Sequence, residues 1–185
     1  MAMLKDSYNY EIYDDYYTPK SAWEQIKHII PKDKIIWEAC MLNSQLSKSP
    51  EYLADITGNE IVFNKEWNFL ECEPPNYDII VTNPPFDKKI KIPILERMVK
   101  LDKPFILVLN TMNTFTKYMR EIFKGNLQHL QIITPDNKIH FDKLIDGELK
   151  PTKNCSFYCI YLCYKMELAP ENLWITSPPK RKVKA

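Results

Sequence analysis

Glycine is scarce in this chain of 185 residues, which contains only Gly58, Gly125 and Gly147. Loops that hold phosphate groups need glycine, because only a backbone without a Cβ approaches a phosphate closely. Both the P-loop and the dinucleotide-binding turn require glycines at short, fixed spacing. The three isolated glycines therefore exclude both kinds of nucleotide site.

Long apolar runs and an excess of one charge are also missing. No stretch approaches the roughly 20 apolar residues that a membrane-spanning helix needs, and residues 1–15 lack the apolar core of a secretion signal. We therefore expect no membrane partner. Lys and Arg together number 25 and Asp and Glu 24. The chain therefore has no large overall positive charge that would indicate binding to nucleic acid. Contacts with nucleic acid would have to come from local basic patches.

The five cysteines are an odd number, and Cys155, Cys159 and Cys163 fall in or beside a predicted strand. Their spacing is not that of a paired metal motif and nothing nearby completes a ligand set, so we expect buried thiols and no metal site. Free thiols favour a reducing intracellular compartment, either cytoplasm or nucleus. The basic stretch 179–183 resembles a nuclear-import signal or a nucleic-acid-binding arm.

Strand-like and helix-like segments alternate along the chain. The apolar patterns predict helices at 21–30, 49–55, 92–101 and 116–124, and strands at 34–40, 60–63, 77–82, 104–109, 130–133 and 156–164. Alternation of this kind is typical of an α/β fold. We expect one domain over residues 1–176, with a doubly wound, mostly parallel sheet of six or seven strands, followed by a flexible basic tail at 177–185.

The segment Asn83-Pro84-Pro85-Phe86 follows a strongly β-branched strand, at the end where open α/β sheets bind ligands. Two prolines stiffen the backbone and leave carbonyl oxygens free to accept hydrogen bonds. The Asn83 side-chain oxygen and the Pro84 carbonyl suit a planar amino group with two hydrogens, and Phe86 offers a face for stacking. The plainer interpretation is a strand end closed by a Pro-Pro turn.

This segment resembles motif IV, (N/D)PP(Y/F), of class I methyltransferases that modify amino groups. It most resembles N6-adenine DNA methyltransferases of the minimal phage- or virus-like type. The resemblance implies a Rossmann-like methyltransferase fold and S-adenosylmethionine (SAM) as cofactor. It also implies catalysis by residues 83–86: Asn83 and the Pro84 carbonyl hold the target amino group, Pro85 keeps the turn, and Phe86 stacks on the base. Asn83 would also contact SAM.

Other segments resemble the family's cofactor-binding pieces in the same order. Tyr17-Thr18-Pro19 resembles the segment that meets the methionine end of SAM. The stretch 35–40, which ends in Glu38-Ala39-Cys40, resembles the first strand, whose acidic end faces the cofactor. The stretch 56–60 resembles the second strand, whose acidic residue, here Glu60, grips the ribose hydroxyls. Asn68 and Phe69 resemble the segment beside the SAM adenine, with Asn68 in place of the usual Asp.

The sequence departs from the family after the first strand, where residues 38–47 contain no glycine. This departure keeps open a non-catalytic methyltransferase-fold subunit that binds nucleic acid or a catalytic partner. A protein glutamine methyltransferase is a further alternative, because an Asn-Pro-Pro segment also holds a side-chain amide. Members of that group usually carry an added N-terminal helical domain, which we do not expect in this chain.

The expected partner is nucleic acid, DNA rather than RNA. Lys88, Lys89 and Lys91 follow Phe86 directly and are predicted to rim the target pocket, where a phosphate backbone would pass. Only the stretch 136–154 is long enough to contribute to target recognition. A separate partner subunit is the other way in which recognition could be supplied.

Overall fold

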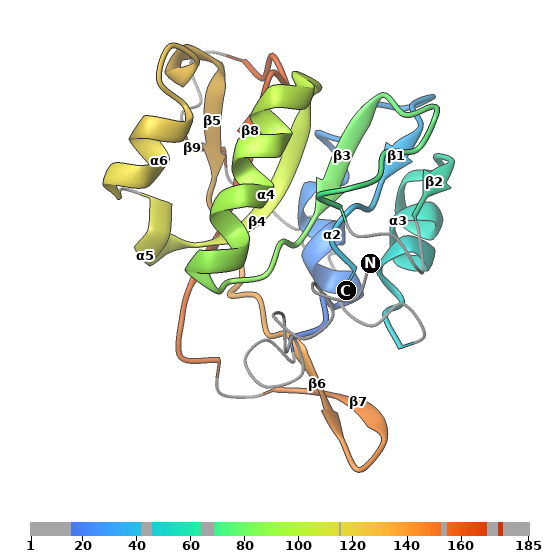
Figure 1. The fold of residues 1–185 in the computed structure, drawn as a ribbon. Coiled ribbons are helices and arrows are strands. Elements are labelled where there is room, and N and C mark those ends of the chain that lie inside the picture. Colours follow the sequence, from blue (N-terminus) through green and yellow to red (C-terminus); the bar gives the residue numbers. More distant parts are fainter. Residues whose placement is uncertain are drawn as a thin grey trace, which may run out of the picture.

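A seven-stranded sheet forms the centre of the molecule (Figure 1). The computed structural model describes residues 16–41, 46–63, 69–114, 116–152, 155–169 and 174–175. The strand order is β2-β1-β3-β4-β8-β5-β9, and each neighbouring pair is parallel except the two pairs that include β8. This confirms the predicted α/β class with a mostly parallel sheet. The strands are β1 (Ile36–Trp37), β2 (Ile61–Val62), β3 (Ile79–Thr82), β4 (Phe105–Asn110), β5 (Leu130–Ile133), β8 (Cys159–Tyr164) and β9 (Trp174–Ile175).

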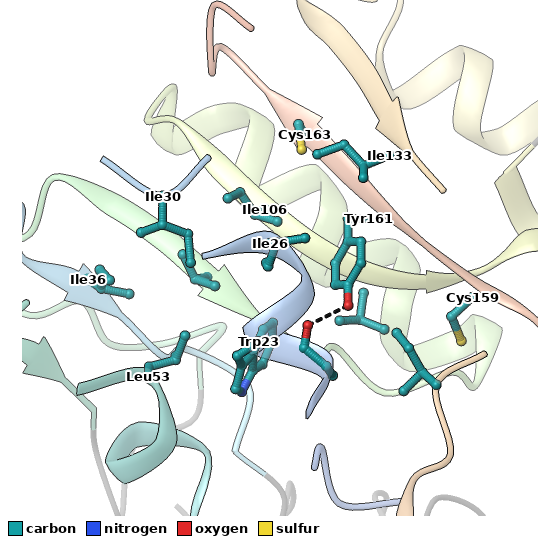
Figure 2. Packing of buried hydrophobic residues seen from close by; sticks show 14 of the residues in the cluster. Trp23, Ile26, Ile30, Ile36, Leu53, Ile106, Ile133, Cys159, Tyr161 and Cys163 are labelled. Atoms are coloured by element: carbon teal, nitrogen blue, oxygen red, sulfur yellow. Dashed lines mark hydrogen bonds between the residues drawn. The ribbon is translucent and has the colours of Figure 1, made fainter. Parts of the chain in front are cut away.

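Helices cover both faces of the sheet, as the doubly wound prediction required. Successive strand residues point to opposite faces, so Val81 packs in one core with Trp23, whereas Ile80 packs in the other with Leu95. Figure 2 shows the first core, where the Tyr161 hydroxyl donates a hydrogen bond to a backbone carbonyl of α2. The helices are α2 (Lys20–Ile26) and α3 (Ser49–Thr57) on that face, and α4 (Lys88–Leu101) and α6 (Lys117–Ile122) on the other.

The main element that the sequence did not predict is a hairpin within the stretch 136–154. It consists of β6 (Asp142–Ile145) and β7 (Glu148–Pro151) and projects beyond the sheet at the end where α4 begins (Figure 1). The hairpin could have been predicted from the Asp146-Gly147 pair in the sequence. The φ angles of these residues, 54° and 80°, match a two-residue type I′ turn. Further short elements were also not predicted: α5 (Thr111–Thr114), the 3-10 helix η1 (Leu127–His129) and β9.

Several sequence-based expectations concern features other than the sheet. Cys155, Cys159 and Cys163 are buried thiols that form no disulfide bond, as predicted. Within the described ranges no group of three or more potential ligands gathers as a metal site, and no helix there has the length and apolar character to cross a bilayer. The basic tail 177–185 lies outside the described residues.

Candidate active site

The Asn-Pro-Pro-Phe motif begins one residue after the central strand β3. This strand lies between β1 and β4, runs parallel to both, and buries all four of its residues. Its β-branched side chains suit a strand that is covered on both faces. The carboxyl ends of parallel strands share one edge of the sheet, which is where open α/β sheets bind ligands. The predicted position of Asn83 just beyond a central strand is therefore confirmed.

A buried carboxylate, Glu38, lies beside the motif at the end of β1. Its residue is 3% exposed. One carboxylate oxygen accepts a hydrogen bond from the Thr82 hydroxyl and the other from the Ser49 hydroxyl. Thr82 Oγ1 in turn accepts from the Cys40 backbone N–H at 2.9 Å, and Ser49 Oγ accepts from the Trp23 indole at 3.0 Å. This network joins β1, β3, α2 and α3 around the site.

The environment of Glu38 changes its acidity. Burial raises the pKa of this carboxyl from 4.5 to about 7, and the hydrogen bonds from Ser49 and Thr82 oppose that rise. The carboxyl is therefore close to half-protonated near neutral pH. The sequence predicted that Glu38 faces the cofactor, whereas in the structure each of its oxygens is bonded to a hydroxyl of the protein.

A small cavity of about 20 Å³ adjoins Asn83. A space of this size holds about one water molecule. The cavity brings together three segments that the sequence assigned to one site: Tyr17 with Thr18, Glu38 with Cys40, and Asn83. Its lining residues are Tyr16, Tyr17, Thr18, Glu38, Cys40, Met41, Ser47, Ser49 and Asn83.

Asn83 contributes an acceptor that the described part of the protein leaves unused. Its side-chain oxygen Oδ1 is buried and has no hydrogen-bond partner among the described residues. An unpaired buried acceptor costs roughly 1–3 kcal/mol, and such atoms are rare enough to need an explanation. Because Asn83 lines the cavity, a donor group of a ligand or a water is the natural partner for this oxygen.

Phe86 belongs to a cluster of aromatic rings at the same edge of the sheet. Its ring centre lies 5.8 Å from that of Phe141 and 5.1 Å from that of Phe157, both edge to face. Tyr16 contacts the same two rings in the same manner. Edge-to-face packing of this kind fixes ring orientation. Phe86 as a whole residue is only half-buried.

The aromatic cluster also anchors the β6–β7 hairpin. Phe141 directly precedes β6 and is fully buried. The next residue, Asp142, pairs with Tyr17 through two backbone hydrogen bonds of 2.9 Å. The base of the hairpin, at Phe141 and Asp142, is thus held next to the cavity and to the Phe86 ring.

The lysines predicted to rim the target pocket do not share one environment. Lys88 and Lys89 are exposed, and the Lys88 ammonium lies 5.3 Å from the centre of the Tyr118 ring. Lys91 is 0% exposed, and its Nζ donates a hydrogen bond to the Phe86 carbonyl oxygen at 3.1 Å. The predicted phosphate contact of Lys91 is wrong, because a phosphate cannot reach a fully buried ammonium.

Helical spacing could have identified the burial of Lys91. It lies three, four and seven residues before Ile94, Leu95 and Met98, which form the buried face of α4. The helix starts at Lys88 and not at residue 92, because the Asp87 side chain caps it by accepting from the backbone N–H of the second helical residue at 2.7 Å. The predicted start thus excluded Lys91 from the apolar pattern.

Glu60 does not join the predicted cofactor residues. Strand β2 begins at Ile61, which pairs with Ile36, so Glu60 lies toward the amino end of the strands. Glu38, in contrast, follows the carboxyl end of β1. The exposed Glu60 contributes its backbone carbonyl, which accepts a hydrogen bond from Ile36 N–H at 2.9 Å. Its expected place in one cleft with Glu38 is contradicted, because the strand starts one residue after Glu60.

Phe69 packs in the protein core. It is 6% exposed, its ring centre lies 5.1 Å from that of Trp37, and the Arg97 guanidinium lies 5.5 Å from the same ring. It belongs to the core on the α4 side of the sheet. The neighbouring candidate Asn68 lies outside the described residues.

Sequence reasoning missed Ser49, Thr82 and Phe157. Thr82 was visible as a hydroxyl residue at the end of a buried strand, and Ser49 as the first residue of α3, directly before a proline. Both positions favour a buried hydrogen-bond partner. No local signal indicated Phe157, because its contacts with Phe86 and Phe141 join distant parts of the chain.

The described site can therefore accept a donor group at Asn83 and present an aromatic ring next to it. No family model and no curated protein matches the sequence. A solved SAM-dependent O-methyltransferase from Thermotoga maritima is similar at a TM-score of 0.38 and 11% identity, over 78% of this chain and 64% of that chain. A functionally unknown protein from Deinococcus radiodurans is similar at a TM-score of 0.32 and 12% identity, over 78% of this chain and 83% of that chain.

This chain thus spans about 64% of the length of the Thermotoga enzyme that it resembles. Likenesses at these TM-scores carry no functional argument. The function proposed below rests on the residues of the site.

Proposed function

We propose that this protein is a SAM-dependent N6-adenine methyltransferase that acts on nucleic acid, with DNA preferred over RNA. The observation that supports it most is the unpaired, buried Oδ1 of Asn83 at the carboxyl edge of the sheet. An adenine amino group is a planar donor that would satisfy this acceptor. The ring of the half-buried Phe86, two residues beyond Pro84, offers the stacking surface that a purine needs.

The proposed chemistry requires positioning more than acid–base catalysis. Asn83 accepts one amino hydrogen and directs the nitrogen lone pair toward the methyl donor, while its oxygen dipole stabilises the positive charge that develops on nitrogen. Phe86 holds the base after it has left the helical stack. Bound SAM supplies an activated methyl group, whose leaving group is a neutral thioether.

The chemistry of the residues at this cavity suits one end of the cofactor, although the volume of the cavity does not yet admit it. Tyr17, Thr18, Cys40 and Asn83 border the cavity at the carboxyl edge and would hold the methionine end of SAM. The cavity of about 20 Å³ is much smaller than the whole cofactor. The remainder of the cofactor would have to lie outside this cavity.

A non-catalytic subunit is the second candidate. The small cavity favours it, as do the Glu38 oxygens, both of which are bonded to the protein itself. The absence of glycine from residues 38–47 also favours the non-catalytic subunit. Such a subunit would use the same edge of the sheet to bind nucleic acid or a catalytic partner.

Cofactor binding and methyl transfer separate the two candidates. Calorimetry with SAM and with its demethylated product tests the first property. Incorporation of radiolabelled methyl into single-stranded DNA, duplex DNA and RNA tests the second. The enzyme hypothesis expects both signals, and a roughly 100- to 1000-fold lower rate in Asn83→Ala, because one preorganised catalytic contact is lost.

The matched control is Asn76→Ala, an exposed asparagine outside the motif, which should keep the wild-type rate. Full activity in Asn83→Ala would remove the proposed mechanism. A wild-type protein that binds neither SAM nor its product, and transfers no methyl group, would establish the non-catalytic candidate.

A further inference from the structure

Lys91 is a buried charged residue that the proposed mechanism does not use. Its side chain lies in the protein interior, on the face of α4 that packs against the sheet. Moving an ammonium out of water is costly unless strong hydrogen bonds replace its hydration. Its Nζ donates to the carbonyl oxygen of Phe86 at 3.1 Å. The buried ammonium of Lys91 is thus hydrogen-bonded to Phe86, the last residue of the motif.

Buried ionisable side chains bond to the residue just before the motif and to the last residue of the motif. At the start, Thr82 donates to the Glu38 carboxylate. At the end, Phe86 accepts from Lys91. The intervening Pro84 and Pro85 restrict the backbone, so fixing these two ends limits the positions available to the segment between them.

The contact with Lys91 also ties Phe86 to the first turn of α4. The backbone N–H of Lys91 donates to the Asp87 carbonyl at 2.9 Å, and its side chain reaches back one residue further to Phe86. On its other side the Phe86 ring is confined by Phe141 and Phe157. The aromatic contacts set the ring plane, and the Lys91 hydrogen bond sets the backbone from which the ring projects.

We propose that Lys91 is a positioning residue that fixes the Phe86 ring for the incoming target base. The inference rests on the proposed function and adds a residue to it. Lys91 acts through the Phe86 carbonyl and touches no substrate. Its loss should therefore weaken substrate binding with little effect on the turnover of bound substrate.

The test compares Lys91→Met with Lys100→Met, the same substitution at an exposed position of the same helix. The readouts are the Kd for a fluorescent adenine-containing single-stranded oligonucleotide, and the KM and kcat of methyl transfer. We expect Kd and KM to rise roughly 2- to 10-fold in Lys91→Met, the effect of one lost hydrogen bond. The kcat should stay within about 2-fold, and Lys100→Met should match the wild type.

A double-mutant cycle with Phe86→Ala separates positioning from a general loss of stability. If Lys91 acts through the Phe86 ring, Lys91→Met should change Kd little once the ring is removed. An equal loss in both backgrounds, or a Kd in Lys91→Met within 2-fold of wild type, overturns the inference. Should Lys91→Met fail to fold, Lys91→Gln takes its place with a loss in the same direction, because a shorter and neutral amide cannot reproduce the hydrogen bond of an ammonium to the Phe86 carbonyl.

The outcomes also distinguish this inference from the proposed function. Wild-type binding and methyl transfer with an unaffected Lys91→Met would overturn the inference alone. If the wild-type protein neither binds nor methylates the oligonucleotide, the proposed function is wrong. The role of Lys91 in positioning a base is then wrong as well.

Discussion

Thr82 donates its hydroxyl hydrogen to the carboxylate of Glu38 across the neighbouring strands β3 and β1. Thr82 directly precedes Asn83, and the other Glu38 oxygen accepts from Ser49 at the start of α3. Protonation of Glu38 adds a donor and removes an acceptor from this network. The charge of one buried carboxyl is therefore coupled to the residue next to Asn83.

The first prediction concerns the pH dependence of stability at Glu38. Its raised pKa means that the folded state binds the extra proton between pH 4.5 and about 7, so stability falls as pH rises through this window. The shift corresponds to an effect on the order of 3 kcal/mol. Glu38→Gln cannot titrate at this position. Its free energy of unfolding, relative to that of the wild type, should therefore rise by about 2–3 kcal/mol between pH 5 and pH 8.

Urea unfolding of both proteins at the two pH values measures this difference. The exposed Glu96→Gln, in the middle of α4, is the control for the loss of a surface carboxylate. If the gap between Glu38→Gln and wild type is the same at pH 5 and pH 8, Glu38 does not have the predicted pKa.

The second prediction is that Asn83→Ala does not destabilise the fold. Its Oδ1 has no partner among the described residues, and removing a buried unpaired acceptor relieves a cost of roughly 1–3 kcal/mol. Asn59→Ala provides the contrast, since its amide donates to the Pro31 carbonyl at 2.8 Å and its loss should cost about 1 kcal/mol. Urea denaturation should rank Asn83→Ala at or above wild type and Asn59→Ala below it. The opposite ranking would show that Asn83 has a structural partner.

The third prediction concerns Phe86. Phe86→Ala should weaken binding of an adenine-containing oligonucleotide by roughly 1–3 kcal/mol, the usual effect of a lost stacking surface. Asn83→Ala should instead affect mainly turnover. The exposed Phe63→Ala, at 41% exposure outside the aromatic cluster, is the control. Fluorescence anisotropy measures binding, and equal affinities for wild type and Phe86→Ala would exclude stacking on this ring.

The fourth prediction concerns the turn of the β6–β7 hairpin. Gly147 has a φ of 80°, and a Cβ added at this position would meet nothing within 4 Å, so Gly147→Ala meets backbone strain but no clash. The cost should be about 1–2 kcal/mol and should appear as faster amide exchange in the hairpin, with β4 unaffected. Gly147→Asn should cost less, because asparagine tolerates this conformation. Faster exchange across the whole sheet would mean that the hairpin supports the core.

Local sequence patterns predicted most of the fold and the centre of the site. The β-branched run before Asn83 predicted β3, and its parallel neighbours placed the motif at the ligand-binding edge. The apolar spacing of Ile94, Leu95 and Met98 predicted the buried face of α4. These features depend on the order of residues within one segment, which the sequence states directly.

The predictions that were wrong depended on boundaries. Moving the start of α4 to Lys88 brings Lys91 onto the buried face, and starting β2 at Ile61 moves Glu60 away from the site. The helix starts four residues earlier than predicted, and the strand begins after Glu60 instead of ending at it. Each of these changes moves a side chain to a different face or end of its element. Capping by Asp87 decided the first boundary, and pairing with β1 decided the second.

The sequence by itself determined that Asn83, two prolines and Phe86 follow the carboxyl end of a buried strand. Only the tertiary structure decided which groups surround them: Glu38 bonded to Thr82 and Ser49, and Lys91 bonded to the Phe86 carbonyl. The physical reason is that a local pattern fixes the direction of side chains along one element. The partner of a buried polar group depends on strand register and helix packing, which bring together residues far apart in the chain.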